Sequence, residues 1–249
     1  GFNLVRIPHT TPPVHVLDIA AAYGLRVMVG LSAEQYIGYL IDKKKAPDIK
    51  GLLQEKARRV AEHPALFAIA LGNEIPASMA RWLGRKRIEQ YLKQAYKWVK
   101  AVAPNALVTY VNYPTTEYIQ LPFLDFLCFN VYLENRKAFE RYLARLHNIA
   151  DDRPLLLGEI GLDMVCAGLV IFTWTDEWFR GGEEVHDLSF GLTHKKRAPK
   201  PALEAVQTTF SNAPYYTDWH ELPMISVVVC TYNGAATIKE CMEGLVTLN

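Results

Sequence analysis

Hydrophobic positions along the chain fall into two alternating patterns. Short continuous apolar runs are typical of strands that are covered on both faces. Between them, apolar residues recur every three or four positions, which is typical of helices with one buried face. The predicted strands cover residues 2–6, 25–29, 65–71, 107–111, 126–131, 155–159 and 169–174. The predicted helices begin after Pro13 and cover 52–61, 85–102, 137–149 and 201–210. This alternation predicts βαβ units and a parallel sheet.

The order of elements predicts an α/β fold, a (β/α)8 TIM barrel with parts missing from the chain. Only residues 161–168 separate the predicted strands 155–159 and 169–174, whereas a parallel crossover needs about a dozen residues and usually a helix. We therefore expect one helix to be absent at this place. Because an open ring of strands leaves two unpaired edges, we also expect the first strand to lie before Gly1.

The composition changes after the last predicted helix. Residues 212–223 form a linker rich in Pro and aromatic residues, and a new strand, turn and helix pattern begins at Ile225. A closed ring of eight strands has no place for a ninth, so this pattern is either a clasp on the barrel or the start of another domain. We divide the chain into a barrel domain at 1–211, a linker at 212–223 and a short β-α fragment of a second domain at 224–249.

Two glutamates stand at the ends of buried runs. Glu74 follows Gly72-Asn73 at the end of one predicted strand, and Glu159 ends another. The carboxyl ends of barrel strands line the active site of this fold. Cleavage of a glycosidic bond needs a proton for the leaving oxygen and a negative charge facing the oxocarbenium-like carbon. A single strand-end Glu could be an ordinary surface residue, but the matched pair predicts catalysis on a glycosidic bond.

The two carboxyl groups would have different roles. Carboxyl groups about 5 to 5.5 Å apart favour retention through a covalent glycosyl-enzyme. Glu74 would be the acid and then the base, and Glu159 the nucleophile. Glu74 must then stay protonated while Glu159 stays ionised, which a cation such as Arg6 would favour. Tyr132 could donate a hydrogen bond to Glu159, although an aromatic residue at a strand end is more often a packing residue.

Three further residues are candidates for binding a sugar, each with a structural alternative. Asn73 could bond a sugar 2-hydroxyl, or it could cap a loop. His9 could contact the sugar, or it could be a structural histidine. Trp174 could form an apolar floor under the sugar ring, or it could be a buried barrel residue.

Composition excludes several other classes of protein. Half of the 249 residues are apolar, and 27 Lys and Arg balance 26 Asp and Glu, so nothing draws the chain to nucleic acid or to an anionic membrane. No apolar stretch approaches the ~20 residues of a membrane span. The four cysteines have no paired spacing, and phosphate-loop and dinucleotide motifs are absent, so we expect no metal and no cofactor. No signal peptide is visible, and we expect a cytoplasmic location, with membrane association through regions outside this chain left open.

Several motifs occur in an order that resembles a known family. Residues 1 to about 210 resemble the TIM-barrel domain of glycoside hydrolase family 2 and its relatives, a retaining clan with catalytic glutamates on strands 4 and 7. Residues 2–9 with Pro12-Pro13 are similar to its second-strand motif, and Gly72-Asn73-Glu74 to its acid/base motif. Glu159 is similar to its nucleophile and Phe172-Thr173-Trp174 to its eighth-strand tryptophan. The resemblance implies that Tyr132 serves Glu159 rather than packing.

Residues 225–245 resemble the first strand and turn of a family 2 glycosyltransferase. Together the two resemblances imply a bifunctional polysaccharide-processing protein, in which a retaining glycoside hydrolase that acts on a β-linked glycan precedes a transferase. Two alternatives stay open, because fold alone does not decide function. The barrel could bind or guide an oligo- or polysaccharide for the transferase without turnover, or it could be a transglycosylase, in which a sugar hydroxyl replaces water.

Overall fold

The structure is a computed structural model that describes residues 3–211 apart from 134, 161–167, 178, 181–182 and 187–188. The predicted linker and second-domain fragment lie outside the described residues, as does the place between strands at which a helix was expected to be missing. The division of the chain into domains therefore stays a prediction.

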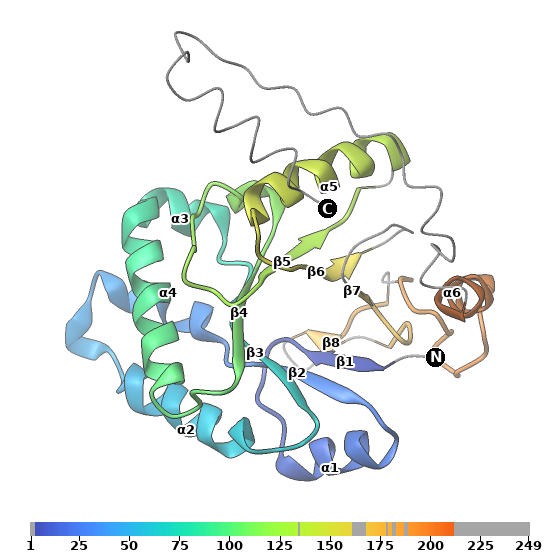
Figure 1. The fold of residues 1–249 in the computed structure, drawn as a ribbon, viewed down its shortest axis with the longest axis horizontal. Coiled ribbons are helices and arrows are strands. Elements are labelled where there is room, and N and C mark those ends of the chain that lie inside the picture. Colours follow the sequence, from blue (N-terminus) through green and yellow to red (C-terminus); the bar gives the residue numbers. More distant parts are fainter. Residues whose placement is uncertain are drawn as a thin grey trace, which may run out of the picture. The chain divides into compact units, whose positions relative to one another are not determined.

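The centre of the fold is a seven-stranded parallel sheet in which each strand pairs with the next in chain order. The strands are β1 (Leu4–Ile7), β2 (Arg26–Gly30), β3 (Leu66–Asn73), β4 (Leu107–Asn112), β5 (Leu127–Val131), β6 (Leu155–Ile160) and β7 (Gly168–Ile171). The first and last strands, β1 and β7, contact each other, so the sheet curves into a nearly closed barrel (Figure 1). The predicted α/β barrel is confirmed.

Helices surround the strands on the outside, as Figure 1 shows. The α-helices are α1 (Val14–Ala22), α2 (Ile49–Ala61), α3 (Ala77–Leu83), α4 (Arg85–Lys100), α5 (Arg136–Ala150) and α6 (Pro201–Ser211). Short 3-10 helices are η1 (Ala33–Leu40), η2 (Lys43–Lys45) and η3 (Pro114–Thr116). Each helix predicted for residues 1–211 is present. The sequence analysis did not predict α3, the 3-10 helices, or the hairpin of β8 (Phe179–Arg180) and β9 (Glu183–Glu184).

Apolar spacing and caps account for the helices. The apolar face of α4 is buried through Ile88, Leu92 and Val99, at the helical spacing that the sequence analysis used. The Asp48 side chain accepts a hydrogen bond from Gly51 N at the start of α2, and the Asn135 side chain accepts one from Ala138 N at the start of α5. These caps satisfy donors that a helix leaves unpaired in its first turn.

Alternation along the strands divides the core into an outer and an inner part. In β3, Ile69 belongs to the cluster that packs against the helices, whereas Ala68 and Ala70 belong to a smaller cluster with Met28 of β2 and Cys128 of β5. Successive side chains of a strand point to opposite faces, so this smaller cluster fills the barrel interior. Small residues there leave room for polar side chains above them, at the carboxyl ends of the strands.

The last strand of the barrel is shorter than predicted. We predicted a strand over 169–174, but β7 ends at Ile171. Beyond it, the chain pairs with a later segment instead of with β6. Thr173 N donates to Phe190 O, and Thr193 N donates to Trp174 O. Trp174 thus lies in a loop above the strand end and not on the strand.

Candidate active site

Arg6 of β1 joins the ends of distant strands. Its Nη1 donates to Glu159 Oε1 of β6 at 2.5 Å and to the Gly158 carbonyl at 3.2 Å. Its Nη2 donates to Asn73 Oδ1 of β3 at 2.5 Å. The side chains of Arg6 and Glu159 are only 3% and 12% exposed, so the ion pair is largely withdrawn from water. A pair so shielded is stronger than one on the surface.

The second carboxyl group belongs to the same set of contacts. Asn130 of β5 donates through Nδ2 to Glu74 Oε1 at 2.8 Å and to Asn73 Oδ1 at 3.3 Å. Contacts therefore run without a break from Glu159 through Arg6, Asn73 and Asn130 to Glu74. We call these residues, together with Tyr132, the carboxylate network. Both predicted catalytic glutamates lie in it, at the carboxyl ends of β3 and β6.

A constrained turn positions Glu74. Its backbone has a φ of 47°, in the left-handed region that residues other than Gly rarely adopt. Its N–H donates to the Val111 carbonyl at 2.9 Å. Just beyond, Ile75 N donates to the buried Tyr110 hydroxyl, and Ala77 N to the Tyr113 hydroxyl, each at 2.8 Å. Such backbone strain persists only where contacts with the surrounding residues fix the conformation, and it is common at functional sites.

The surroundings of Glu74 favour its protonated form. Burial raises the pKa of the Glu74 carboxyl, and the negative charge of Glu159 raises it further. The hydrogen bond from Asn130 and the charges of Arg6 and His9 act in the opposite direction but do not cancel the rise. Glu159, by contrast, bonds directly to a guanidinium. The two carboxyl groups therefore lie in different electrostatic environments, as an acid and a nucleophile require.

Tyr132 contacts Glu159 from the other side. Its hydroxyl donates to Glu159 Oε2 at 2.5 Å, so the hydrogen bond expected from the family resemblance is present. Partial burial, and next the charge of Glu159, raise the pKa of the Tyr132 phenol, which remains a donor. Its ring stands edge-on to Phe172 at 6.5 Å and lies 6.4 Å from Phe190.

His9 and Asn73 are linked through a residue that the sequence analysis did not select. Glu34, in η1, accepts a hydrogen bond from Asn73 N at 3.1 Å, and its other oxygen lies 3.9 Å from His9 Nδ1. Interaction with Glu34 is the main reason that the pKa of His9 is raised. A Cβ at Gly72 would come within 2.5 Å of Glu34 Oε2, so any larger residue there would displace this carboxylate from its present position. The His9 side chain is 53% exposed beside the network.

Trp174 is 51% exposed, so it is not a buried barrel residue. Its carbonyl accepts hydrogen bonds from the backbone N–H and the hydroxyl of Thr193, which hold the loop beyond β7. Its predicted place under a sugar ring stays a prediction.

Two residues of the site were missed by the sequence analysis for different reasons. Asn130 interrupts the apolar run of β5, and a lone polar residue in a buried strand is a signal that could have been used. Glu34 lies in a 3-10 helix that no hydrophobic periodicity marked. Its contact with Asn73 joins residues 39 positions apart, and only the folded chain brings them together.

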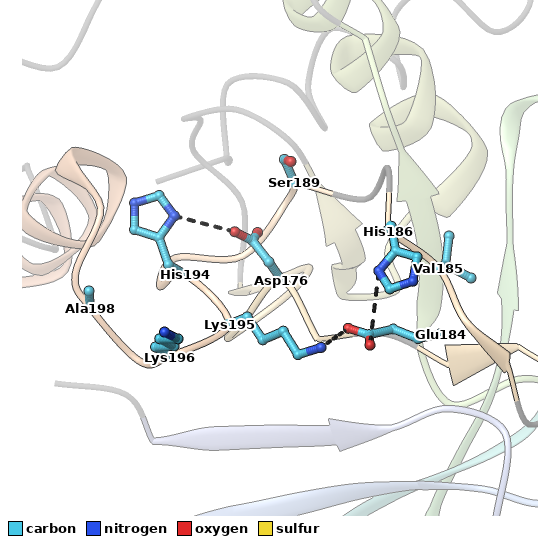
Figure 2. A pocket seen from close by; sticks show the side chains of 9 residues that line it. All are labelled: Asp176, Glu184, Val185, His186, Ser189, His194, Lys195, Lys196 and Ala198. Atoms are coloured by element: carbon cyan, nitrogen blue, oxygen red, sulfur yellow. Dashed lines mark hydrogen bonds and ion pairs between the residues drawn. The ribbon is translucent and has the colours of Figure 1, made fainter.

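A polar pocket of about 430 Å³ lies in the segment between β7 and α6 (Figure 2). Its lining residues are Asp176, Glu184, Val185, His186, Ser189, His194, Lys195, Lys196 and Ala198. Glu184 forms an ion pair with Lys195 and lies 3.9 Å from His186, and Asp176 lies 3.6 Å from His194. None of the lining residues belongs to the carboxylate network, and most of the charges in this pocket are already compensated.

Within the described residues, no group of three or more His, Cys, Asp or Glu side chains is arranged to hold a metal ion. In the same part of the chain, no helix has both the length and the apolar character needed to cross a bilayer.

Comparison with models of protein families gives a match for the barrel. Residues 1–183 match the family described as "Glycosyl hydrolases family 2, TIM barrel domain". A comparison with curated proteins found no match.

Solved structures with the same fold include several glycosidases. The β-glucuronidase of Faecalibacterium prausnitzii superimposes with a TM-score of 0.65 at 17% identity, covering 85% of this chain and 43% of its own. The β-D-glucuronidase of Dictyoglomus thermophilum gives 0.66 at 16% identity, covering 85% and 45%. The family 2 β-galacturonidase of Eisenbergiella tayi, bound to galacturonate, gives 0.63 at 16% identity, covering 84% and 44%. The chain thus spans less than half of the length of these proteins.

Proposed function

The chain belongs to glycosyl hydrolase family 2, and on that premise we propose that it is a retaining glycosidase that cleaves a β-linked glycan by double displacement. The observation that carries the proposal is the carboxylate network. It brings Glu74 and Glu159 from two strand ends into one set of contacts and places them in different electrostatic environments. Cleavage of a glycosidic bond requires two carboxyl groups whose environments differ in this way, because one must be protonated and the other ionised.

In the first step, a carboxylate oxygen of Glu159 attacks the anomeric carbon, and the bond from that carbon to the leaving oxygen breaks. Glu74 gives its proton to the leaving oxygen, so the aglycone departs as an alcohol and Glu74 becomes a carboxylate. The raised pKa of Glu74 keeps the proton available at a pH at which an ordinary glutamate would have lost it. The product of this step is a glycosyl ester of Glu159.

In the second step, the Glu74 carboxylate takes a proton from a water molecule, whose oxygen attacks the anomeric carbon. The ester bond to Glu159 breaks, and the sugar leaves with its original configuration because the centre has been inverted twice. The pKa of Glu74 responds to this cycle, because the charge of Glu159 that raises it is absent while the ester exists. Glu74 therefore keeps its proton in the free enzyme, where it must act as the acid, and ionises more readily in the intermediate, where it must act as the base.

Other residues of the site position the reacting groups. Arg6 and Tyr132 each bond one oxygen of Glu159, which orients the carboxylate and stabilises it when it leaves the anomeric carbon in the second step. Asn73 uses its carbonyl oxygen to accept bonds from Arg6 and Asn130, which leaves its amide hydrogens for a sugar 2-hydroxyl. His9 and Trp174 would contact the sugar from the rim.

The wider activity is part of the same proposal. The resemblance of residues 225–245 to the start of a family 2 glycosyltransferase supports a protein that both cleaves and builds a polysaccharide. The solved relatives are named for glucuronides and galacturonate, but identities of 14–18% support a common fold and not a common substrate.

Covalent labelling tests the proposal. The full-length protein would be incubated with a panel of 2-deoxy-2-fluoro β-glycosides bearing activated leaving groups, and its proteolytic peptides would be analysed by mass spectrometry. We expect one sugar per chain on the peptide that contains Glu159, and NMR of an early reaction with an unfluorinated substrate should show the β-anomer first. Labelling of another residue, or α-anomer as the first product, would refute the double displacement at Glu159.

A further inference from the structure

We propose that the sugar bound beside the carboxylate network is a neutral one without a carboxylate, and that Phe190 is a specificity-determining residue for it. This inference rests on the proposed function and names the substrate class of the same site.

The first argument is the charge balance of the site. The carboxylates of Glu34 and Glu159 meet the basic side chains of Arg6 and His9, while the surroundings of Glu74 favour its protonated, neutral form. Arg6 is bonded to Glu159 and to Asn73, and His9 faces Glu34. Both cations therefore already face a carboxylate of the protein. A carboxylate on the sugar would have to compete with Glu159 for Arg6 and with Glu34 for His9, and those two anions would repel it.

The second argument concerns the basic residues that follow β7, in the segment that also contains Phe190. Most of those that the structure describes already have carboxylate partners. The pairs are Lys195 with Glu184, Arg197 with Glu177 and Lys200 with Asp176. Lys196 lines the polar pocket of Figure 2, whose residues are separate from the carboxylate network.

The third argument is the aromatic surface that borders Glu159. The rings of Tyr132, Phe172 and Phe190 contact one another with centroids 6.4 to 6.5 Å apart. Tyr132 and Phe190 are nevertheless 45% and 55% exposed, so part of this surface faces solvent. Because Tyr132 also bonds Glu159, the surface is continuous with the catalytic carboxylate. Carbon-bound hydrogens of a neutral sugar pack well on aromatic rings, whereas a carboxylate placed there would lose its hydration.

The fourth argument is that backbone contacts hold Phe190 in place. Its carbonyl accepts a hydrogen bond from Thr173 N, and the next residue, Gly191, donates its N–H to Asp176 Oδ1 at 3.0 Å. A Cβ at Gly191 would lie 2.4 Å from the Thr175 carbonyl carbon, so only glycine allows the two segments to approach so closely. Phe190 is thus a positioned part of the site, and its side chain can select between substrates.

Parallel kinetics and binding test the inference. Full-length protein would be assayed with 4-nitrophenyl β-glycosides of glucose, galactose, mannose and xylose, and with those of glucuronic and galacturonic acid. Binding of the methyl glycosides would be followed by saturation-transfer NMR, which needs no turnover. We expect at least one neutral glycoside to exceed both uronides in kcat/KM by at least about tenfold. A uronide as the best substrate would overturn the inference, decisively so if Lys196→Ala abolished that preference.

Variants test the role of Phe190. Phe190→Ala should raise KM for the best neutral substrate about twofold to tenfold with a smaller change in kcat, and Phe190→Leu should restore part of the loss. Phe190→Lys should narrow the discrimination against uronides. Tyr23→Ala, at a side chain 80% exposed next to α1, is the matched control and should change neither parameter. An unchanged KM in Phe190→Ala would overturn the role of Phe190.

The two proposals fail in different ways. Binding of neutral glycosides without hydrolysis of any glycoside would refute the proposed glycosidase but support the inference about substrate class. Hydrolysis confined to uronides would support the proposed glycosidase but refute the inference about substrate class. Binding of neither class of glycoside would refute both proposals.

Discussion

The Tyr132 hydroxyl donates a hydrogen bond of 2.5 Å to Glu159 Oε2, while Arg6 holds the other oxygen of the same carboxylate at 2.5 Å. Each oxygen of the proposed nucleophile thus has a donor from a different strand region. A carboxylate held in this way has little freedom to rotate, and its orientation toward the anomeric carbon is set before the substrate binds.

Replacing the phenol tests that relationship. Tyr132→Phe keeps the ring against Phe172 and Phe190 but removes the donor. Since a hydrogen bond to a charged group contributes about 1.5–3 kcal/mol, we expect kcat/KM to fall roughly tenfold to a hundredfold. Steady-state kinetics with an aryl glycoside would measure the loss. Tyr23→Phe serves as the control, and activity equal to that of the unmodified protein in Tyr132→Phe would show that the hydroxyl has no catalytic part.

The separation of the two carboxyl groups is a second prediction. We expect the carboxyl groups of Glu74 and Glu159 to lie about 5 to 5.5 Å apart, the separation of retaining glycosidases. A crystal structure would measure it directly. A separation of roughly 9 Å would leave space for a water molecule between enzyme and sugar and would indicate inversion instead.

Chemical rescue separates the roles of the two glutamates. Glu74→Ala should slow hydrolysis strongly for substrates with poor leaving groups and much less for activated aryl glycosides, which need no proton. Azide should then accelerate the variant by attacking the intermediate, and NMR should identify a β-glycosyl azide. Glu159→Gln should form no glycosyl-enzyme at all. An α-glycosyl azide, or rescue of the wrong variant, would contradict the assignment.

The Asn130 amide should control the pH dependence. Its hydrogen bond stabilises the ionised form of Glu74 and so lowers the pKa of that carboxyl. Removing the bond in Asn130→Ala should raise the pKa further. Because the first step needs protonated Glu74, activity is lost as pH rises through this pKa, so the alkaline limb of kcat/KM should move to higher pH. The position of the limb is the readout, and a shift to lower pH would count against the prediction, whatever happens to the maximum rate.

Close packing at the end of β2 gives a prediction about stability. A Cβ at Gly30 would lie 1.9 Å from the Pro8 carbonyl oxygen, whereas one at Gly38 meets nothing within 4 Å. Gly30→Ala must therefore displace the backbone that leads to His9, and we expect a loss of about 3 kcal/mol or more in the free energy of unfolding. Gly38→Ala is the matched control. Equal thermal midpoints for the two variants would show that the backbone near Pro8 can move aside without loss of stability.

Much of the fold could be predicted from local patterns. The runs that became β2 to β6 are continuous and apolar because parallel strands in a barrel are covered on both faces. In α4, the apolar residues recur at helical spacing because one face of the helix is buried. Glu74 and Glu159 could be selected because each follows such a run, and a strand end determines which face of the barrel a residue reaches. All these features depend on residues that are close together in the chain.

Only the tertiary structure decided how the selected residues meet. The register of paired strands shifts between Ala70 and Asn73 and between Phe129 and Asn130, immediately beside the polar groups of the site. Such irregularities turn side chains in directions that strict alternation does not predict. The left-handed backbone of Glu74 likewise depends on contacts with another strand.

The sequence by itself determined the barrel, the order of its elements and the two strand-end glutamates, because hydrophobic periodicity and strand ends are local properties. The tertiary structure alone decided that Asn130 and Glu34 belong to the site, that Arg6 also bonds Asn73, and that Phe190 borders Tyr132. The physical reason is that these contacts join segments far apart in the chain, and their geometry depends on strand register and on the close approaches that glycine permits.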